Sequence, residues 1–177
     1  MRRNATLLNK DRGHAKKFLL LPQSSLVFLD FAKFPLALIV HDHELMWAHY
    51  ADQYRGICIA YSFAKLLDSL GDDVSFVRMY YNEIVPIVRH SRQEPADVAK
   101  MVLSYKNYRW LYEREWRMFA PLGKAPYDDK SCVTRLYLGS RIASGKRNKI
   151  IRAMSSLDIE TYDMKIEKYS IVFEPCS

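Results

Sequence analysis

The apolar stretches of this chain are short, and proline or charged residues interrupt them. Phe18 to Leu21 is followed at once by Pro22, and the stretch from Leu26 to Val40 contains Asp30 and Pro35. A helix that crosses a bilayer needs about 20 consecutive apolar residues. We therefore expect no membrane contact, and we interpret both stretches as core strands or as an interaction surface. No cleavage site of small residues follows the first stretch, so a secretory signal peptide is not expected.

The length of 177 residues corresponds to a single domain. A domain of this size buries roughly 70% of the surface that its unfolded chain exposes, so it folds without disulfides or a structural metal. Short β-type segments alternate with short amphipathic segments along the whole chain. This pattern predicts an α+β fold with a mixed, mainly antiparallel sheet and three to four helices. Residues 1–17 are expected to form a basic arm or a frayed helix.

The formal net charge of +7 makes nucleic acid or an anionic ligand a partner to consider. Basic residues are densest from Arg2 to Lys17 and from Arg141 to Arg152. Neither region contains a recognition element or a set of stacking aromatic residues. We therefore expect only weak, non-specific and salt-sensitive binding of nucleic acid, with a solvated basic surface as the simpler interpretation.

The three cysteines are Cys58, Cys132 and Cys176, an odd number without a C-x-x-C spacing. This pattern argues against a disulfide framework and a zinc ribbon, and it favours free thiols in a reducing cytoplasm. His41 and His43 offer two metal ligands, but no third ligand follows at a familiar spacing. The sequence therefore predicts neither a bound metal nor a cofactor.

Helices are expected where a polar residue precedes an amphipathic segment. The first is expected to begin after Asp42 and to run to about Tyr54, with Gly56 as its C-cap. Three more are expected, from Ser62 to before Gly71, from the Ser91–Pro95 segment to about Lys106, and over residues 145–156. Strands are expected where β-branched and aromatic residues gather, over residues 57–61, 74–81, 110–119, 133–138, 159–166 and 169–174.

The first candidate site segment runs from Glu44 to Gly56. On a helix, Trp47 and Tyr50 lie on an aromatic side that suits a core, whereas His49 and Asp52 lie on the other side. Because Asp52 comes three residues after His49, its carboxylate is expected to contact the imidazole and to raise the pKa of that ring. Such a pair suits acid–base chemistry or anion binding, and the alternative is a histidine that only tethers its helix.

The second candidate site segment is Tyr112–Arg117. In a strand, Glu113, Glu115 and Arg117 project from one face, and Tyr112 projects from the other. That face is either solvated, paired with other charges, or a site in which the carboxylates share acid–base or hydroxyl-binding work. In a helix, Glu113 and Arg117 would instead form an ordinary i,i+4 pair. The loop before residue 145 also offers an anion site, although a simple helix start is the plainer interpretation.

Three motifs in fixed order resemble a widespread bacterial family of unknown function. They are Leu45-Met-Trp-Ala-His-Tyr-Ala51 with Gly56, Trp110-x-Tyr-Glu-x-Glu-Trp-Arg117, and Leu136-Tyr-Leu-Gly139. The resemblance covers about residues 44–140, and residues 44–177 are taken as the family-like region. Residues 18–43 lack the Asn-Asp-Pro and Cys-Phe-Ser segments of the family and are interpreted as a diverged N-terminal part. The resemblance transfers positions and no activity, because the family has none assigned.

Two functions follow from these patterns as hypotheses. The first is a non-catalytic binding or self-assembling protein from a mobile or defence-related gene, which the shortened N-terminal part and the abundant tyrosines favour. The second is an enzyme that resembles ADP-ribosyltransferases and acts on a nucleotide-type substrate. In that enzyme Glu115 or Glu113 would be the acid, with His49, Arg117, Asp52, Tyr50 and Tyr112 as further contacts. The apolar stretch from Leu26 to Val40 also predicts a two-fold homodimer.

Overall fold

A computed structural model of the chain describes residues 16–21, 36–37, 41–72, 74–88, 94–119 and 130–177. The basic arm expected over residues 1–17 lies outside the described residues except for Lys16 and Lys17, which begin strand β1 (Lys16–Leu21). Most of the stretch from Leu26 to Val40 also lies outside them, and with it the observation on which the expected dimer was based.

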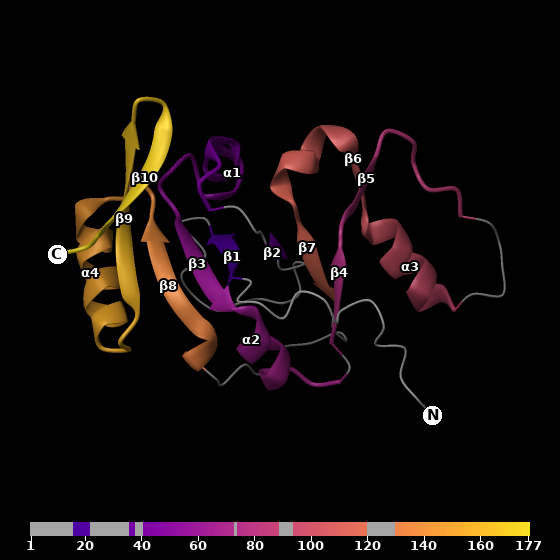
Figure 1. Ribbon diagram of the computed structural model, residues 1–177, viewed down its shortest axis with the longest axis horizontal. Coiled ribbons are helices and arrows are strands. Elements are labelled where there is room, and N and C mark those ends of the chain that lie inside the picture. Colours follow the sequence, from indigo (N-terminus) through magenta and orange to yellow (C-terminus); the bar gives the residue numbers. More distant parts are fainter. Residues whose placement is uncertain (1–15, 22–35, 38–40, 73, 89–93, 120–129) are drawn as a thin grey trace.

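The fold is α+β with mainly antiparallel sheets, as the sequence predicts, and its largest sheet has five strands (Figure 1). The strand order is β1, β3 (Ile57–Ser62), β8 (Val133–Leu138), β9 (Glu160–Glu167) and β10 (Ser170–Pro175). Neighbours in this sheet run antiparallel except β8 and β9, which run parallel. The parallel pair needs a crossover, and helix α4 (Ser144–Ser155) provides it.

Three further strands form a second antiparallel sheet in the order β2 (Leu36–Ala37), β7 (Trp116–Phe119) and β4 (Ser75–Arg78). Strands β5 (Tyr80–Asn82) and β6 (Tyr105–Asn107) form a parallel pair beside it. Helix α3 (Pro95–Leu103) connects these two strands. In Figure 1 α3, β5 and β6 lie at the opposite end of the molecule from α4.

Helices α1 (Glu44–Tyr50) and α2 (Phe63–Ser69) flank β3 in the sequence. His43, not the expected Asp42, occupies the N-cap position of α1. The helix ends earlier than expected because Asp52, Gln53 and Tyr54 have φ angles of 48°, 52° and 68°. These left-handed residues form a turn that leads directly into β3. A short 3-10 helix, η3 (Lys130–Cys132), precedes β8.

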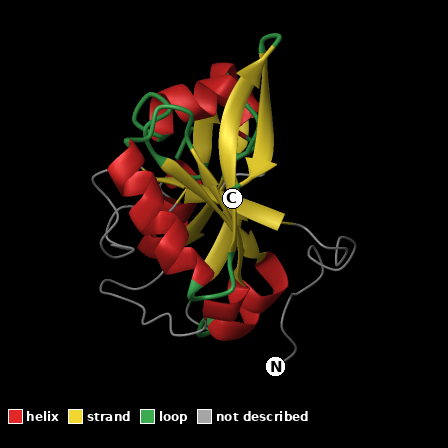
Figure 2. Cartoon of the chain, turned by 90° about the vertical axis from the view of Figure 1, so that its left-hand side faces the viewer, coloured by secondary structure: helices red, strands yellow, loops and turns green. Residues whose placement is uncertain are grey.

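The two faces of the five-stranded sheet bury different sets of side chains, because successive residues of a strand point to opposite faces. One set joins residues of α1 to β3, β8 and β9, and its members are Met46, Trp47, Ala51, Cys58, Ala60, Tyr137 and Met164. The other set packs α4 against the sheet through Ile57, Leu136, Leu138 and Ile150. Figure 2 shows α4 lying along one side of the strands. The sheet is therefore covered by α1 on one face and by α4 on the other.

The left-handed turn after α1 packs against the end of β8. A Cβ atom at Gly139 would lie 2.1 Å from the carbonyl oxygen of Tyr54. The backbone N–H of Gly139 also donates to the oxygen of Gly56 at 3.0 Å, and that of Arg141 donates to Tyr54 at 3.0 Å. Two of the three sequence motifs therefore meet here, and only a residue without a side chain fits at position 139.

Candidate functional site

Glu113 and Glu115 are the most deeply buried charged side chains among the described residues. Glu113 is 0% exposed and Glu115 is 1% exposed. Burial of a carboxylate is costly unless hydrogen bonds and an opposite charge compensate it. The partners of these two glutamates therefore decide what this part of the molecule does.

Lys106 on β6 supplies the cation that lies between the two carboxylates. Its ammonium donates to Oε2 of Glu113 and to Oε2 of Glu115, the latter at 2.9 Å. It also donates to the hydroxyl of Tyr50 at 3.4 Å. The ammonium lies over the ring of Trp110, 5.2 Å from its centroid, which adds a cation–π interaction. All three donors of the ammonium are thus used within the protein.

The remaining carboxylate oxygens are also occupied. The hydroxyl of Tyr50 donates to Oε1 of Glu113 at 2.7 Å. Nε of Arg117 donates to Oε1 of Glu115, and Nη1 of the same guanidinium donates to the carbonyl oxygen of Leu103. Each of the four carboxylate oxygens therefore accepts a hydrogen bond. Two negative charges face two positive charges, so the cluster is balanced in charge.

Backbone contacts place Glu115 within this cluster. The N–H of Glu115 donates to the hydroxyl of Tyr81 at 2.8 Å, and its carbonyl oxygen accepts from the N–H of Met79 at 3.0 Å. Tyr81 lies opposite Lys106 in the register of β5 and β6. We call the six side chains Tyr50, Tyr81, Lys106, Glu113, Glu115 and Arg117 the Lys106 network. They come from α1, β5, β6, the segment after β6, and β7.

The electrostatic environment keeps the donors of the Lys106 network in their donating forms. Burial and the hydrogen bond to Glu113 raise the pKa of Tyr50 well above its ordinary value. Burial lowers the pKa of Lys106, but the hydrogen bonds to Glu113 and Glu115 outweigh it, so the net shift is upward. At neutral pH the phenol is therefore protonated and the ammonium is charged.

The segment before β7 is a 3-10 helix, η2 (Tyr108–Glu113), and the strand expected over residues 110–119 is wrong in its first half. The side chain of Asn107 caps η2 by accepting from the N–H of Arg109 at 3.0 Å. Arg114 then adopts a left-handed conformation, with φ of 46°. The chain changes direction at this residue, between Glu113 and Glu115, and both carboxylates contact the ammonium of Lys106. The three predicted residues are linked through Lys106 and Arg117, but they do not form one face of a strand.

His49 lies beside the Lys106 network and not among its hydrogen bonds, although the sequence placed it with the glutamates. Its ring lies edge-on to that of Tyr50, with the centroids 6.4 Å apart. Its side chain is exposed, and its ring lies edge-on to Trp110 with the centroids 5.8 Å apart. Asp52 does not pair with His49 as expected, because it lies in the left-handed turn and forms an ion pair with Arg55 at 2.9 Å. The expected imidazole–carboxylate pair is therefore not formed.

The aromatic residues of the two candidate segments differ in burial and in partners. Trp47 is fully buried, and its Nε1 donates to the carbonyl oxygen of His41 at 2.6 Å, as expected of a core residue. Tyr50 belongs to the Lys106 network. Tyr112 is half-buried and stacks on His43, with centroids 4.9 Å apart. Trp116 is only partly buried.

Sequence reasoning missed Lys106 and Tyr81. Lys106 precedes Glu113 by seven residues, but it lies in strand β6 and Glu113 ends a 3-10 helix, so no single periodic element relates the two. Tyr81 is brought to Glu115 by tertiary pairing, that of β4 with β7 and that of β5 with β6. One signal in the sequence could have indicated them. Two carboxylates on a buried face need more hydrogen-bond donors than Arg117 alone provides, so a further cation had to be nearby.

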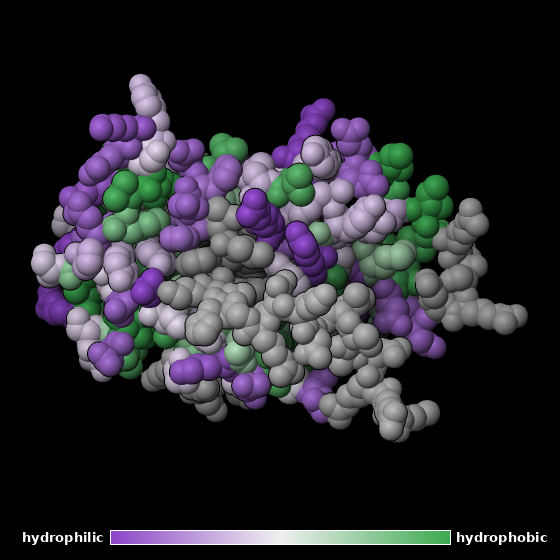
Figure 3. Space-filling model, in the orientation of Figure 1, coloured by the Kyte–Doolittle hydropathy of each residue, from purple (hydrophilic) through white to green (hydrophobic). Residues whose placement is uncertain are grey.

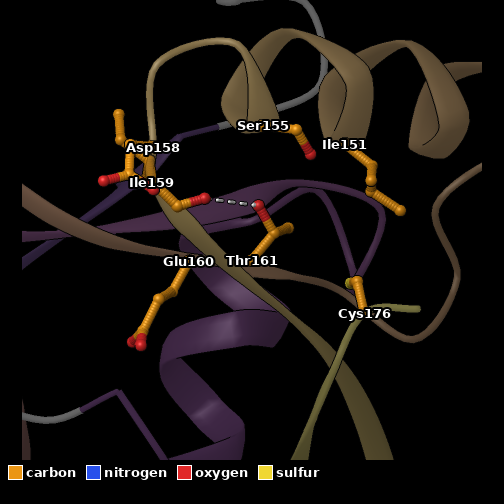
Figure 4. Close-up of a pocket in the computed structure, with 7 residues that line it drawn as sticks. All are labelled: Ile151, Ser155, Asp158, Ile159, Glu160, Thr161 and Cys176. Atoms are coloured by element: carbon orange, nitrogen blue, oxygen red, sulfur yellow. Dashed lines mark hydrogen bonds between the residues drawn. The ribbon is translucent and has the colours of Figure 1, made fainter.

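A separate shallow pocket of about 300 Å³ lies between α4 and the end of the five-stranded sheet (Figure 4). Ile151 and Ser155 line it from α4, and Thr161 and Cys176 line it from the sheet side. It contains none of the predicted site residues. Within the described part of the chain, no group of three or more His, Cys, Asp or Glu residues could hold a metal ion. The three cysteines are free thiols.

The described elements thus define a small α+β protein with a buried, charge-balanced network at one end. Residues 46–118 match the family model described as a protein of unknown function (DUF2971). The matched segment contains every member of the Lys106 network. The third sequence motif, Leu136 to Gly139, lies outside the matched segment. No curated protein and no solved structure matches the chain. None of the helices in the described residues has the length and apolar character that crossing a bilayer requires.

Proposed function

We propose that this protein is non-catalytic and acts by binding a macromolecular partner. On this proposal the Lys106 network is a framework that fixes the positions of α1, β5, β6 and β7 relative to one another. The proposed location in the cytoplasm and the origin from a mobile or defence-related gene rest on the sequence alone.

The saturation of the two carboxylates is the observation that carries this proposal. A general acid, or a carboxylate that holds a substrate hydroxyl, needs an oxygen atom that faces the substrate. Both oxygens of Glu115 already accept from Lys106 and Arg117, and the side chain is 1% exposed. A substrate would have to break these ion pairs and leave their cations buried, which costs several kcal/mol. Such a network stabilises a structure more readily than it serves a reaction.

The exposed surface near the network supports the binding function. Tyr80, Tyr108 and Leu111 are exposed on β5 and η2. Large exposed apolar side chains that gather on one part of a protein are typical of contact surfaces. The network lies directly beneath these elements and holds them in place.

Replacement of Glu115 by glutamine tests the proposal against the ADP-ribosyltransferase-like alternative. The glutamine keeps the size of the side chain but removes the charge that Lys106 and Arg117 share. We expect Glu115→Gln to lower the free energy of unfolding by about 3 kcal/mol, because two cations lose a buried counter-charge. We also expect no nucleotide, NAD or oligonucleotide to raise the melting temperature of the wild-type protein.

Glu174→Gln is the matched control, because Glu174 pairs with Lys165 at the surface and both side chains are about half exposed. An exposed pair contributes about 0–1 kcal/mol, so the control should be close to the wild type. The proposal would be overturned by a nucleotide or NAD that stabilises the wild-type protein, combined with a Glu115→Gln variant of unchanged stability that no longer binds it. That result would establish Glu115 as a ligand-binding acid.

A further inference from the structure

Residues 139–157 contain five basic residues and no acidic one. The basic residues are Arg141 before α4 and Lys146, Arg147, Lys149 and Arg152 within it. This short segment has a formal charge of +5, whereas the whole chain has +7. Exposed helix faces are ordinarily stabilised by pairs of acidic and basic residues three or four positions apart. Helix stability therefore does not explain a face with a single sign of charge.

Most of these cations have no counter-charge in the described part of the chain. Arg147 forms an ion pair with Asp163 on β9, and both side chains are partly buried. The other four side chains are exposed and form no ion pair with a described residue; they are Arg141, Lys146, Lys149 and Arg152. A polyanion whose charges they neutralise releases the counterions condensed on it, which favours binding.

Three of the free cations form a row along α4. Lys146, Lys149 and Arg152 follow one another at intervals of three residues, and residues three apart on a helix are neighbours. The row covers about 9 Å of the helix axis, because each residue rises about 1.5 Å. One strand of a nucleic-acid duplex places a phosphate about every 3.4 Å along the duplex axis. The row therefore matches about three consecutive phosphates.

The position of Lys146 opposes the stability of its own helix. It lies in the first turn of α4, which contains no acidic residue and has no side-chain cap. The N-terminus of a helix carries a partial positive charge, so a cation in this turn is unfavourable. A surface for an anionic partner accounts for this placement, whereas stabilisation of the fold does not.

The other side chains around the row suit a phosphate backbone better than exposed bases. Ser144, Asn148 and Ser155 are exposed and small, and each can donate a hydrogen bond to a phosphate oxygen. No aromatic residue occurs from residue 139 to residue 157. Proteins that bind single strands stack the bases on aromatic side chains. The composition therefore favours a duplex, whose phosphates face outward and whose bases are already stacked.

The row is accessible to a large partner. Helix α4 packs on the sheet through Ile150 and leaves its opposite side exposed. Figure 1 shows the helix at one end of the molecule, and hydrophilic side chains, drawn in purple, lie along the same edge in Figure 3.

We propose that the exposed face of α4 is an interaction surface for the phosphate backbone of a nucleic-acid duplex. Arg141, Lys146, Lys149 and Arg152 are the residues that neutralise its charge. The surface lies on other elements than the Lys106 network, so the inference goes beyond the proposed function. Contacts to phosphates position a protein on a duplex without reading its bases, so no preference for a base sequence is expected.

Binding of this kind is weak and depends on salt. Proteins that contact nucleic acid without sequence preference have dissociation constants of about 10⁻⁴–10⁻⁶ M at physiological salt. An oligonucleotide well below its dissociation constant adds almost nothing to the free energy of unfolding, so it does not raise the melting temperature. The interaction has to be measured directly, beginning at low salt.

Fluorescence anisotropy of a labelled DNA duplex, titrated with the full chain at several salt concentrations, tests this proposal. The logarithm of the binding constant should fall linearly with the logarithm of the salt concentration, by about 0.9 for each phosphate contact. Lys149→Gln combined with Arg152→Gln removes two contacts. This variant should bind about tenfold or more weakly at low salt, and its slope should be shallower by about two.

Arg78→Gln combined with Arg109→Gln is the matched control. It removes the same two charges from exposed positions on β4 and η2, which lie away from α4 in Figure 1. Charges distant from the bound phosphates are screened by salt, so the affinity should change by less than about threefold.

Four results would overturn the proposal. They are no binding at low salt, a Lys149→Gln/Arg152→Gln protein that binds like the wild type, equal losses in this variant and the control, and tighter binding of a single strand or of polyglutamate than of the duplex. Equal losses would show an effect of net charge alone, and tight binding of polyglutamate would assign the surface to an acidic protein. Both variants leave the Lys106 network unchanged, so this test and the Glu115→Gln measurement can fail separately.

Discussion

Gly139 and Tyr54 approach each other so closely that a Cβ atom at residue 139 would lie 2.1 Å from the carbonyl oxygen of Tyr54. The backbone of residue 139 fixes the position of a Cβ atom, and the obstructing oxygen is itself a backbone atom, so neither can move as the end of a flexible side chain would. The approach joins the left-handed turn after α1 to the end of β8, and it links the segment that matches the family model to the central sheet.

Gly139→Ala should therefore destabilise the protein by about 3 kcal/mol, since a methyl group in this position forces the turn and the strand apart. Chemical denaturation measures the change directly. Gly145→Ala is the control, because a Cβ atom there meets nothing within 4 Å. In α4 the control should be neutral or gain up to about 1 kcal/mol. Equal effects of the two substitutions would show that the close approach is not a constraint.

Lys106→Met should be among the most destabilising single changes in the network. It keeps most of the side-chain volume but leaves Glu113 and Glu115 buried without their shared cation. Loss of one partner from a buried ion pair costs about 3–5 kcal/mol. Lys165→Met removes an exposed ion pair with Glu174 and should cost no more than about 1 kcal/mol. A Lys106→Met protein as stable as the Lys165→Met control would contradict the framework role.

The ion pair between Arg147 and Asp163 predicts a pH dependence of stability. The hydrogen bond from Arg147 holds the pKa of Asp163 below its ordinary value of 3.8, and burial opposes this only in part. Because the pKa of the folded state is lowered, the pair contributes fully above pH 3.8 and its contribution disappears as the pH falls through the lowered pKa.

The difference in unfolding free energy between the wild type and Asp163→Asn should therefore be constant from neutral pH down to about pH 4 and should shrink below it. Urea denaturation at a series of pH values measures this difference. Asp158→Asn, at an exposed residue after α4, serves as the control variant. A difference that grows on acidification would show that Arg147 does not stabilise the charged carboxylate.

The thiols should be slow to react in the folded protein. Burial raises the pKa of Cys58 well above its ordinary value, and it is also the main cause that raises the pKa of Cys132 and of Cys176 to about 11. Because the thiolate is the reactive form, alkylation at neutral pH should be much slower than for a free thiol. Mass spectrometry should find three modified thiols only after denaturation. Rapid modification of the native protein at Cys132 would argue against its burial.

The part of the fold from residue 133 onward follows from local patterns. Strand β8 has the predicted bounds, and α4, β9 and β10 differ from their predicted bounds by about one residue. These elements are rich in residues that suit their type, β-branched and aromatic residues in the strands and an apolar face in the helix, and residues that favour turns separate them. Here local preference and tertiary packing agree, so the sequence alone is sufficient.

The candidate site depends on relations that no local pattern contains. Glu113, Glu115 and Arg117 were predicted to share a face, and they do contact common partners. The left-handed Arg114 was not predictable, because arginine rarely adopts positive φ and only the surrounding contacts impose it. Lys106 was missed for the same reason, since a parallel strand pair and a 3-10 helix bring it to the glutamates. His49 was placed on the correct side of its helix, but that side faces solvent.

The order of strands in the large sheet has a consequence for synthesis on the ribosome. Strands β1 and β3 can pair as soon as residue 62 has emerged, but the other edge of β3 pairs with β8, which is made only after residue 132. During that interval the nascent chain carries an open strand edge and an uncovered apolar face. Such edges pair readily with other chains. We therefore expect slow translation at low temperature, or a chaperone that binds extended apolar segments, to raise the yield of folded protein by protecting the half-made sheet.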